Sequence, residues 1–267
     1  MIAFPPCKIN LGLNVLRKRP DGYHDLDTVF YPVPWTDILE ILRADVFAFT
    51  ASGEAIPGNE PDNLCVRAYQ LLQQDYGLPP VHIHLHKIIP TGAGLGGGSS
   101  DAAHTLRLLN TLFDLKLTTV QLQNYAARLG SDCAFFISDM PMRGQGRGEI
   151  LTPVDFFLKG KYLMLVKPDI HVSTADAYRG VTPVDVRPSV IDVLARPPVR
   201  WRNALVNDFE VSVFEKYPAI AALKQQMYDA GAVYASMSGS GASVYGVFDE
   251  VPVIQLSSTD NHWMGQL

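Results

Sequence analysis

The sequence lacks the patterns of several protein classes. No apolar run reaches the ~18 residues that a membrane-spanning helix needs, and the chain does not open on a signal-peptide pattern. Positive charge is also scarce, since the net charge is −5 and no stretch is rich in Lys and Arg. We therefore expect a cytoplasmic protein that binds neither membranes nor nucleic acid.

Cysteine is rare and unpaired. Cys7, Cys65 and Cys133 are far apart, and none belongs to a C-x-x-C pair. This spacing argues against a disulfide framework and against a zinc site. Cys133 stands beside Asp132 and could be a nucleophile, but a small buried residue is the favoured interpretation.

Three histidines alternate on a predicted strand. His82, His84 and His86 would place their side chains on one face, and such a face could bind a metal ion. Three ligands from a single strand give poor tetrahedral geometry, so we favour a partly exposed strand face.

What the chain has is a glycine-rich loop. Hydrophobic residues make up 47% of the 267 residues, enough for one large domain or two modest ones. Residues 90–101 read Pro-Thr-Gly-Ala-Gly-Leu-Gly-Gly-Gly-Ser-Ser-Asp, between an alternating apolar run (81–89) and a helix-like run (102–112). Glycine lets backbone N–H groups approach an anion closely, and a helix N-terminus favours negative charge. The pattern predicts a phosphate-binding loop.

Two familiar phosphate motifs fit this loop less well. A P-loop needs Lys before its Ser or Thr, but here Gly98 precedes Ser99 directly. Gly92, Gly94 and Gly97 satisfy the Rossmann spacing, yet no second strand ends in an acidic residue ~20 residues later. A dehydrogenase is therefore the weakest alternative.

Three segments together resemble the GHMP kinases (galactokinase, homoserine kinase, mevalonate kinase, phosphomevalonate kinase). Residues 90–103 resemble the second motif of that family, residues 7–13 the first and residues 237–243 the third. The resemblance covers essentially the whole chain. It implies an α+β fold of two domains with the active site between them. These are a ribosomal-S5-like domain over residues 1–153 that carries the ATP phosphate loop, and a ferredoxin-like domain over residues 154–267.

Four further segments resemble one branch of that family. Residues 21–30 (Asp-Gly-Tyr-His-Asp-Leu-Asp-Thr-Val-Phe) are similar to a block of the kinases that act on 4-diphosphocytidyl-2-C-methylerythritol in the non-mevalonate isoprenoid pathway. Residues 62–64, 129–136 and 146–151 match other blocks, with Ala134 in place of the usual proline. The resemblance implies ATP-dependent phosphorylation of the 2-hydroxyl of that cytidine diphosphate alcohol.

Two other functions remain as alternatives. Homoserine or mevalonate kinase activity is disfavoured by residues 21–30, which resemble a different branch. A catalytically silent nucleotide-binding regulator is disfavoured because the chain retains both Lys8 and Asp132. The expected partner is a small molecule, and the expected state is a monomer or a weak homodimer.

The resemblance assigns the catalytic pair. Asp132 would be the general base, although a helix-capping aspartate is the simpler interpretation of the sequence. Lys8 lies in an otherwise apolar strand, where a cation needs an anionic partner. By resemblance Lys8 lies beside Asp132 and polarises the acceptor hydroxyl.

The remaining site residues divide between nucleotide and acceptor. The expected cofactors are ATP and Mg²⁺, with no protein residue assigned as a metal ligand. The residues expected to bind ATP are Pro90, Thr91, Gly92, Ala93, Gly94, Leu95, Gly96, Gly97, Gly98, Ser99 and Ser100 of the loop, together with Asn63 and Lys87. The residues expected to bind the acceptor are Asn10, Tyr23, His24, Thr174 and Tyr178.

Recognition of the cytosine is expected from three of these side chains. Tyr23 and Tyr178 would stack on the two faces of the base, and a neutral His24 would pair with its polar edge. Ordinary helix packing is the alternative for Tyr178.

Overall fold

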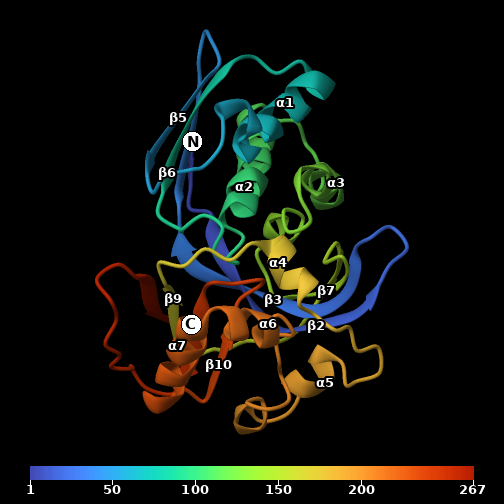
Figure 1. Cartoon of the computed structure of the whole chain (residues 1–267). Coiled ribbons are helices and arrows are strands. Elements are labelled where there is room, and N and C mark those ends of the chain that lie inside the picture. The colour runs from blue at the N-terminus through green and yellow to red at the C-terminus, as the bar shows by residue number, and fades with distance from the viewer. The chain divides into compact units, whose positions relative to one another are not determined.

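Helices and strands alternate irregularly along the chain, as expected for an α+β protein. The computed structural model describes all residues from 1 to 267 (Figure 1). The strands are β1 (Ile2–Ala3), β2 (Pro6–Lys18), β3 (His24–Thr36), β4 (Ile38–Arg43), β5 (Ala48–Gly53), β6 (Val81–Lys87), β7 (Met142–Gly146), β8 (Ile150–Pro153), β9 (Tyr162–Lys167), β10 (Tyr234–Met237), β11 (Val244–Phe248) and β12 (Asn261–Gln266). The helices are α1 (Leu64–Tyr76), α2 (Gly97–Leu112), α3 (Thr119–Leu129), α4 (Thr174–Arg179), α5 (Val190–Leu194), α6 (Glu210–Lys216) and α7 (Pro218–Asp229), with short 3₁₀ turns η1 (Glu60–Asp62), η2 (Phe135–Ile137) and η3 (Pro198–Arg200).

Capping residues set the ends of the helices in the N-terminal half. The side chain of Asn63 accepts a hydrogen bond from the Cys65 N–H, 2.9 Å away, and so caps the start of α1. That helix ends at Gly77, which adopts φ 64°. Thr118 caps α3 through a reciprocal pair of hydrogen bonds with Gln121.

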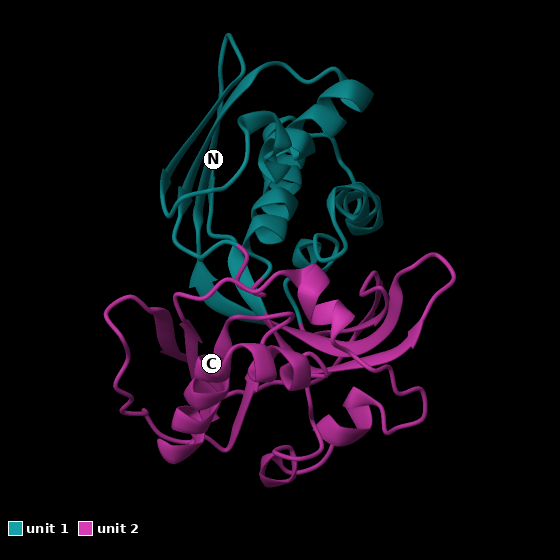
Figure 2. Ribbon diagram, viewed as in Figure 1, with its two compact units in different colours: residues 1–8, 32–91, 96–140 teal, residues 9–31, 92–95, 141–267 magenta.

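The chain divides into two compact units that interleave in the sequence (Figure 2). The first unit contains residues 1–8, 32–91 and 96–140, and the second contains the rest. The expected division of the family's two domains between residues 153 and 154 stays a prediction. No helix is both long enough and apolar enough to cross a membrane.

The first unit is one sheet with three helices. Its strand order is β1-β4-β6-β5, with β4 antiparallel and β5 parallel to β6. Helix α2 packs on α1, α3 and β4. Buried residues from these elements, all at most 1% exposed, form its core: Leu39, Ile41, Ile83, Leu85, Leu106 and Leu109.

The opposite face of β6 carries the three histidines. Thr50 on β5 bonds the ring nitrogens of His82 at 3.0 Å and His84 at 2.7 Å, and Ser52 bonds those of His84 at 3.1 Å and His86 at 2.9 Å. No group of three His, Cys, Asp or Glu side chains could hold a metal ion. The partly exposed face is confirmed, and Thr50 and Ser52 occupy the ring nitrogens of these histidines.

The second unit contains a fully antiparallel sheet of order β10-β11-β9-β12. Helix α7 packs on β10 and β11. Strand β12 lies in residues 249–267, where the sequence shows little periodicity. It pairs with β9 over Asn261 to Gln266, at the edge of the sheet. Its residues are all partly or fully exposed, which explains why no buried apolar face marked it in the sequence.

The third sheet, of order β2-β3-β7-β8, contains strands longer than the sequence predicts. The sequence predicts a short strand at 28–30, whereas β3 runs from His24 to Thr36 and passes through Pro32 and Pro34. Strand β7 pairs only with residues 26–30 of β3. The two prolines lie beyond that pairing, so their missing N–H groups remove no bond to β7.

Candidate active site

The glycine-rich loop leads directly into helix α2. Gly96 is the N-cap of that helix and adopts φ 70°, a left-handed conformation that side chains rarely allow. The helix has 16 residues, and the first N–H groups of a helix have no partner within it. Ser99 and Ser100 stand in its first turn. This geometry suits a phosphate group, as the sequence predicts.

The part of the loop in the second unit is bonded to the third glycine-rich segment. The Ser238 hydroxyl donates to the carbonyl oxygen of Gly94 at 3.0 Å, and the Ser243 N–H donates to that of Ala93 at 3.3 Å. A Cβ on Gly94 would lie 2.2 Å from the carbonyl oxygen of Ser238. Only glycine allows this close approach of two backbones.

Lys8 and Asp132 lie together in the first unit. The Lys8 Nζ is 3.6 Å from Asp132 Oδ2, and the two side chains are 4% and 32% exposed. Burial lowers the pKa of Lys8, and the neighbouring Asp132 carboxylate opposes that shift. Asp132 occupies the turn between α3 and η2, so a buried cation sits beside a carboxylate that solvent and ligands can reach.

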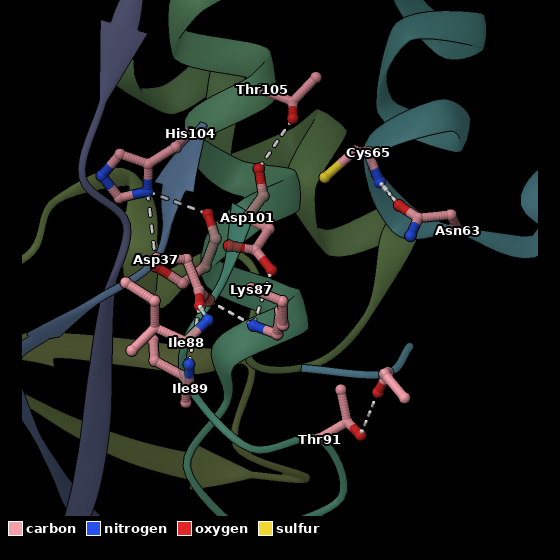
Figure 3. Close-up of polar contacts among 12 residues, drawn as sticks. Asp37, Asn63, Cys65, Lys87, Ile88, Ile89, Thr91, Asp101, His104 and Thr105 are labelled. Atoms are coloured by element: carbon pink, nitrogen blue, oxygen red, sulfur yellow. Dashed lines mark hydrogen bonds and ion pairs between the residues drawn. The ribbon is translucent and has the colours of Figure 1, made fainter. Parts of the chain in front are cut away.

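Lys87 is held inside the first unit by two carboxylates (Figure 3). Its Nζ donates to Asp37 Oδ2 and, at 3.0 Å, to Asp101 Oδ2. Asp37 Oδ1 also accepts from the N–H groups of Ile88 at 2.6 Å and Ile89 at 2.8 Å. Lys87 is only 2% exposed, so it does not reach solvent.

Burial and neighbouring charges shift the pKa values of Lys87 and Asp101 in this cluster. Burial alone would lower the pKa of Lys87, but the charges of Asp101 and Asp37 outweigh it and raise that pKa. Burial raises the pKa of Asp101 to about 8, against the opposing effect of Lys87. Both pKa values are thus raised, which favours the proton-bound form of each group. The second oxygen of Asp101, Oδ1, is buried and has no hydrogen-bond partner.

A small apolar cavity adjoins this cluster. Its volume is about 200 Å³. Its lining includes Pro57, Asn63, Leu64, Lys87 and Asp101. The structure thus brings Asn63 and Lys87, two residues expected on the nucleotide side, to one cavity. The carbonyl oxygen of the Asn63 side chain already caps α1, which leaves its amide nitrogen as the group to contact a ligand.

The aromatic acceptor candidates are arranged differently from the expected sandwich. His24 stacks on Tyr178, with ring centroids 5.0 Å apart and 22° between the planes. Tyr178 also contacts the ring of Phe209 edge-on at 4.7 Å. Tyr23 is 55% exposed and lies under the guanidinium of Arg147, 4.8 Å from its ring centroid. The two tyrosines therefore have different partners, and each could still offer a ring face to a base.

Asn10 and Thr174 have well-defined partners in the second unit. Asn10 is 2% exposed and donates to the Thr28 hydroxyl at 2.9 Å. Thr174, the first residue of α4, shares a 3.0 Å hydrogen bond with the hydroxyl of Ser240 in the third glycine-rich segment. Both side chains are thus fixed by neighbours of their own unit.

Sequence reasoning missed the acidic partners of Lys87. Asp37 lies between the largely apolar strands β3 and β4, and a lone acid in such a place needs a cation, as a lone lysine needs an anion. That rule could have paired Asp37 with Lys87. It could not have found Asp101, which looks like an ordinary residue of a helix's first turn. The contact of Arg147 with the Tyr23 ring was also missed, because Arg147 lies in a turn of the kind that usually only solvates a charge.

Cys133 is buried, at 0% exposure. Burial raises the pKa of its thiol to about 11, so it stays protonated at neutral pH. The preference for a small buried residue is confirmed.

Comparison with known protein families identifies the chain. The family model for the GHMP kinases N terminal domain matches residues 63–139, and that for the GHMP kinases C terminal domain matches residues 193–258. The chain belongs to the GHMP kinase family. It is thus an ATP-dependent small-molecule kinase, and its α+β architecture is that of the family.

Curated relatives place the chain within one branch of the GHMP kinases. It is 53% identical to 4-diphosphocytidyl-2-C-methyl-D-erythritol kinase of Cytophaga hutchinsonii, over 98% of this chain and 97% of the relative. It is also 53% identical to the enzyme of that name from Bacteroides fragilis, over 93% of this chain and 92% of the relative. The resemblance found in the sequence motifs is confirmed.

Solved structures agree with this placement. A crystal structure of 4-(cytidine 5'-diphospho)-2C-methyl-D-erythritol kinase matches with a TM-score of 0.81 at 32% identity, over 92% of this chain and 90% of that one. Homoserine kinase from Cytophaga hutchinsonii matches with a TM-score of 0.67 at 16% identity, over 100% and 94% of the two chains. The second likeness concerns the fold alone.

Proposed function

We propose that the chain transfers the γ-phosphoryl group of ATP to the 2-hydroxyl of 4-diphosphocytidyl-2-C-methyl-D-erythritol, within the non-mevalonate isoprenoid pathway. The observation that carries the catalytic part is the Lys8–Asp132 pair, 3.6 Å apart, with the lysine buried and the carboxylate partly exposed. The acceptor is taken from the names of relatives at 53% identity. Phosphoryl transfer depends mainly on positioning and charge stabilisation, which fixed side chains provide.

In this proposal Asp132 receives the proton of the acceptor hydroxyl. The hydroxyl oxygen forms the new bond to the γ-phosphorus while the bond between that phosphorus and the oxygen of the departing ADP breaks. Lys8 stays bonded to the carboxylate, fixes its direction and stabilises negative charge on the acceptor oxygen. Because Lys8 is fixed by burial, it needs little reorganisation during the reaction.

The nucleotide is assigned to the glycine-rich loop and the adjoining cavity. Backbone N–H groups at the start of α2 would hold the phosphates. The cavity of about 200 Å³ would receive the base. Apolar residues line much of it, and Asn63 and Lys87 supply polar groups. Lys87 would act there through its buried charge, since Asp37 and Asp101 hold its ammonium in place.

A magnesium ion fits this site only as a partner of the phosphates. No group of three His, Cys, Asp or Glu side chains could form a protein cage for it. Mg²⁺ commonly keeps several waters and binds through substrate phosphates with few protein ligands. Of the loop side chains, the half-buried hydroxyl of Ser99 would be the oxygen that joins such a complex. When bound, the ion would neutralise phosphate charge.

The cytidine end of the acceptor is assigned to His24, Tyr178 and Tyr23. Burial, and to a lesser extent the charge of Lys18, lowers the pKa of His24, so its imidazole is neutral at pH 7. A neutral imidazole has one donor and one acceptor, which suits the polar edge of cytosine. Asn10 and Thr174 are assigned to the rest of the acceptor.

An ADP-release assay with a panel of acceptors tests the proposal. We expect ADP release with 4-diphosphocytidyl-2-C-methyl-D-erythritol and none above background with homoserine or mevalonate. Phosphorylation of the 2-hydroxyl should be confirmed by phosphorus NMR of the product. ADP release with homoserine or mevalonate, but not with the cytidine diphosphate alcohol, would refute the acceptor assignment.

A further inference from the structure

Asn207 is a buried side chain whose position no catalytic argument explains. It lies in the second unit, just before helix α6, and is 2% exposed. Its Nδ2 donates to the carbonyl oxygens of both Met237 and Gly239, each at 2.8 Å. Its Oδ1 accepts from the Phe209 N–H at 3.0 Å. The Asn207 amide nitrogen thus donates both of its hydrogen bonds to the backbone of the third glycine-rich segment, residues 237–243.

A second buried anchor holds the same segment from its start. Glu210 Oε1 accepts from the Met237 N–H at 2.8 Å and from the Ser236 hydroxyl at 3.0 Å. Its other oxygen accepts from Lys224 at 2.6 Å. Asn207 and Glu210 therefore fix both the carbonyl and the N–H of Met237. The backbone of residues 237–243 is therefore held in place by buried side chains.

The segment in turn contacts residues assigned to both substrates. Ser238 donates to Gly94 O at 3.0 Å, in the phosphate loop. Ser240 shares a 3.0 Å hydrogen bond with Thr174, one of the acceptor candidates. Residues 237–243 thus connect Asn207 to Gly94, which is assigned to ATP, and to Thr174, which is assigned to the acceptor.

We propose that Asn207 is a positioning residue for phosphoryl transfer, which acts through residues 237–243 to set the phosphate loop at Gly94. The proposal rests on the assignment of that loop to ATP. Asn207 itself touches neither substrate. If its two donated hydrogen bonds are lost, the carbonyls of Met237 and Gly239 lose their fixed direction, and Ser238 can no longer hold Gly94 at one distance. A displacement of about 1 Å in such a site is enough to lower turnover strongly.

The decisive variant is Asn207→Asp, which keeps the shape of the side chain and its hydrogen-bond-accepting oxygen but removes the amide donor. We expect the Kd for ATP, measured by calorimetry, to rise about tenfold or more, as for the loss of two buried hydrogen bonds. Ser238→Ala removes only the link to Gly94 and should raise the Kd about three- to tenfold. The double variant should be no weaker than Asn207→Asp alone, because both changes act along one path.

Asn110→Asp is the matched control. Asn110 also clamps a turn, accepting from the Leu117 N–H at 2.9 Å and donating to the Leu117 carbonyl at 3.2 Å, but at the far end of α2. The ATP affinity of the Asn110→Asp variant should stay within about twofold of wild type even if the melting temperature of that variant falls. Should Asn207→Asp fail to fold, the Ser238→Ala arm still decides the role of the segment.

Two results would overturn the proposal. One is an Asn207→Asp protein that melts earlier yet binds ATP as wild type does, which would leave Asn207 a purely structural residue. The other is fully additive losses in the double variant. Failure of the proposed acceptor would be seen separately, as wild-type protein that binds ATP but releases no ADP with the cytidine diphosphate alcohol.

Discussion

Replacing Asp132 by Asn should separate catalysis from binding more cleanly than any other change in the first unit. The amide keeps the size of the side chain but cannot accept the proton of the acceptor hydroxyl. General-base catalysis contributes ~10²–10⁴-fold to a rate, so turnover should fall by about 100-fold or more. The ATP affinity should stay near that of wild type, because nothing in the nucleotide assignment depends on this carboxylate.

The distance between Asp132 and Lys8 also gives the strength of their electrostatic attraction. At 3.6 Å and an effective dielectric constant of ~20, the attraction between Lys8 and Asp132 is roughly 4–5 kcal/mol before screening of the partly exposed carboxylate. The two side chains should therefore act as a unit. Lys8→Met alone should cost much of the rate, and adding it to Asp132→Asn should cost little more.

The assay is coupled ADP release at saturating acceptor, with melting temperatures recorded so that only folded variants are compared. Asp75→Asn is the matched control, because Asp75 pairs with Arg128 at 3.7 Å in the same unit and has no assigned role in the reaction. Turnover of Asp132→Asn within about threefold of wild type would refute the general-base role. Fully additive losses in the double variant would refute the idea of a coupled pair.

Three further predictions concern recognition and stability. Tyr178→Ala should raise the acceptor KM about 5–150-fold, the scale of one lost stacking contact, whereas Tyr178→Phe should be nearly silent; a lower melting temperature with an unchanged KM would assign the ring to packing alone. Because burial lowers the pKa of His24 below its ordinary 6.5, its imidazole is neutral at and above that pH, so the acceptor KM should be flat there and rise only in acid, where the imidazole takes up its proton; a KM that stays flat down to the pH at which the protein unfolds would exclude a neutral-imidazole contact. In urea titrations at pH 7, Asp37→Asn should lower the free energy of unfolding by about 3 kcal/mol or more, as for a broken buried ion pair, because this carboxylate accepts from Lys87 and from the N–H groups of Ile88 and Ile89. Asp101→Asn should cost less, because burial raises the pKa of Asp101 and favours its neutral form; equal losses would contradict this difference between the two carboxylates.

Much of the local structure could be predicted because its causes are local. The helix over Leu64–Tyr76 has its stop signal at Gly77, and helix α3 has its cap at Thr118, so both follow from a few consecutive residues. Strand β12 and the length of β3 could not be predicted in this way. An edge strand needs no buried face of its own, and a strand through two prolines is allowed only where no partner needs their N–H groups.

The site was predictable in a similar, limited sense. The glycine run and the start of α2 follow from backbone chemistry, and the family motifs pointed to Lys8 and Asp132, which the structure places 3.6 Å apart. The stacking of His24 on Tyr178 could not be derived, because it joins residues more than 150 positions apart. Contacts of this kind depend on how the strands and helices pack, which composition and spacing do not encode.

The glycines of the phosphate loop illustrate where sequence reasoning stops. From the sequence, each of them could be present to let the backbone approach an anion. In the structure, a Cβ at Gly94 would meet the Ser238 carbonyl oxygen at 2.2 Å, and one at Gly97 would meet Lys87 Nζ at 2.9 Å, whereas Gly98 has nothing within 4 Å. Gly94 is thus required by the protein's own backbone, and a side chain at Gly97 would press on Lys87 and Ile89, before any nucleotide binds. Gly98 has no such neighbour, and in the proposed function its missing side chain serves the close approach of the phosphates. The same residue type in one short run therefore answers two different physical demands, and only the packing around each position separates them.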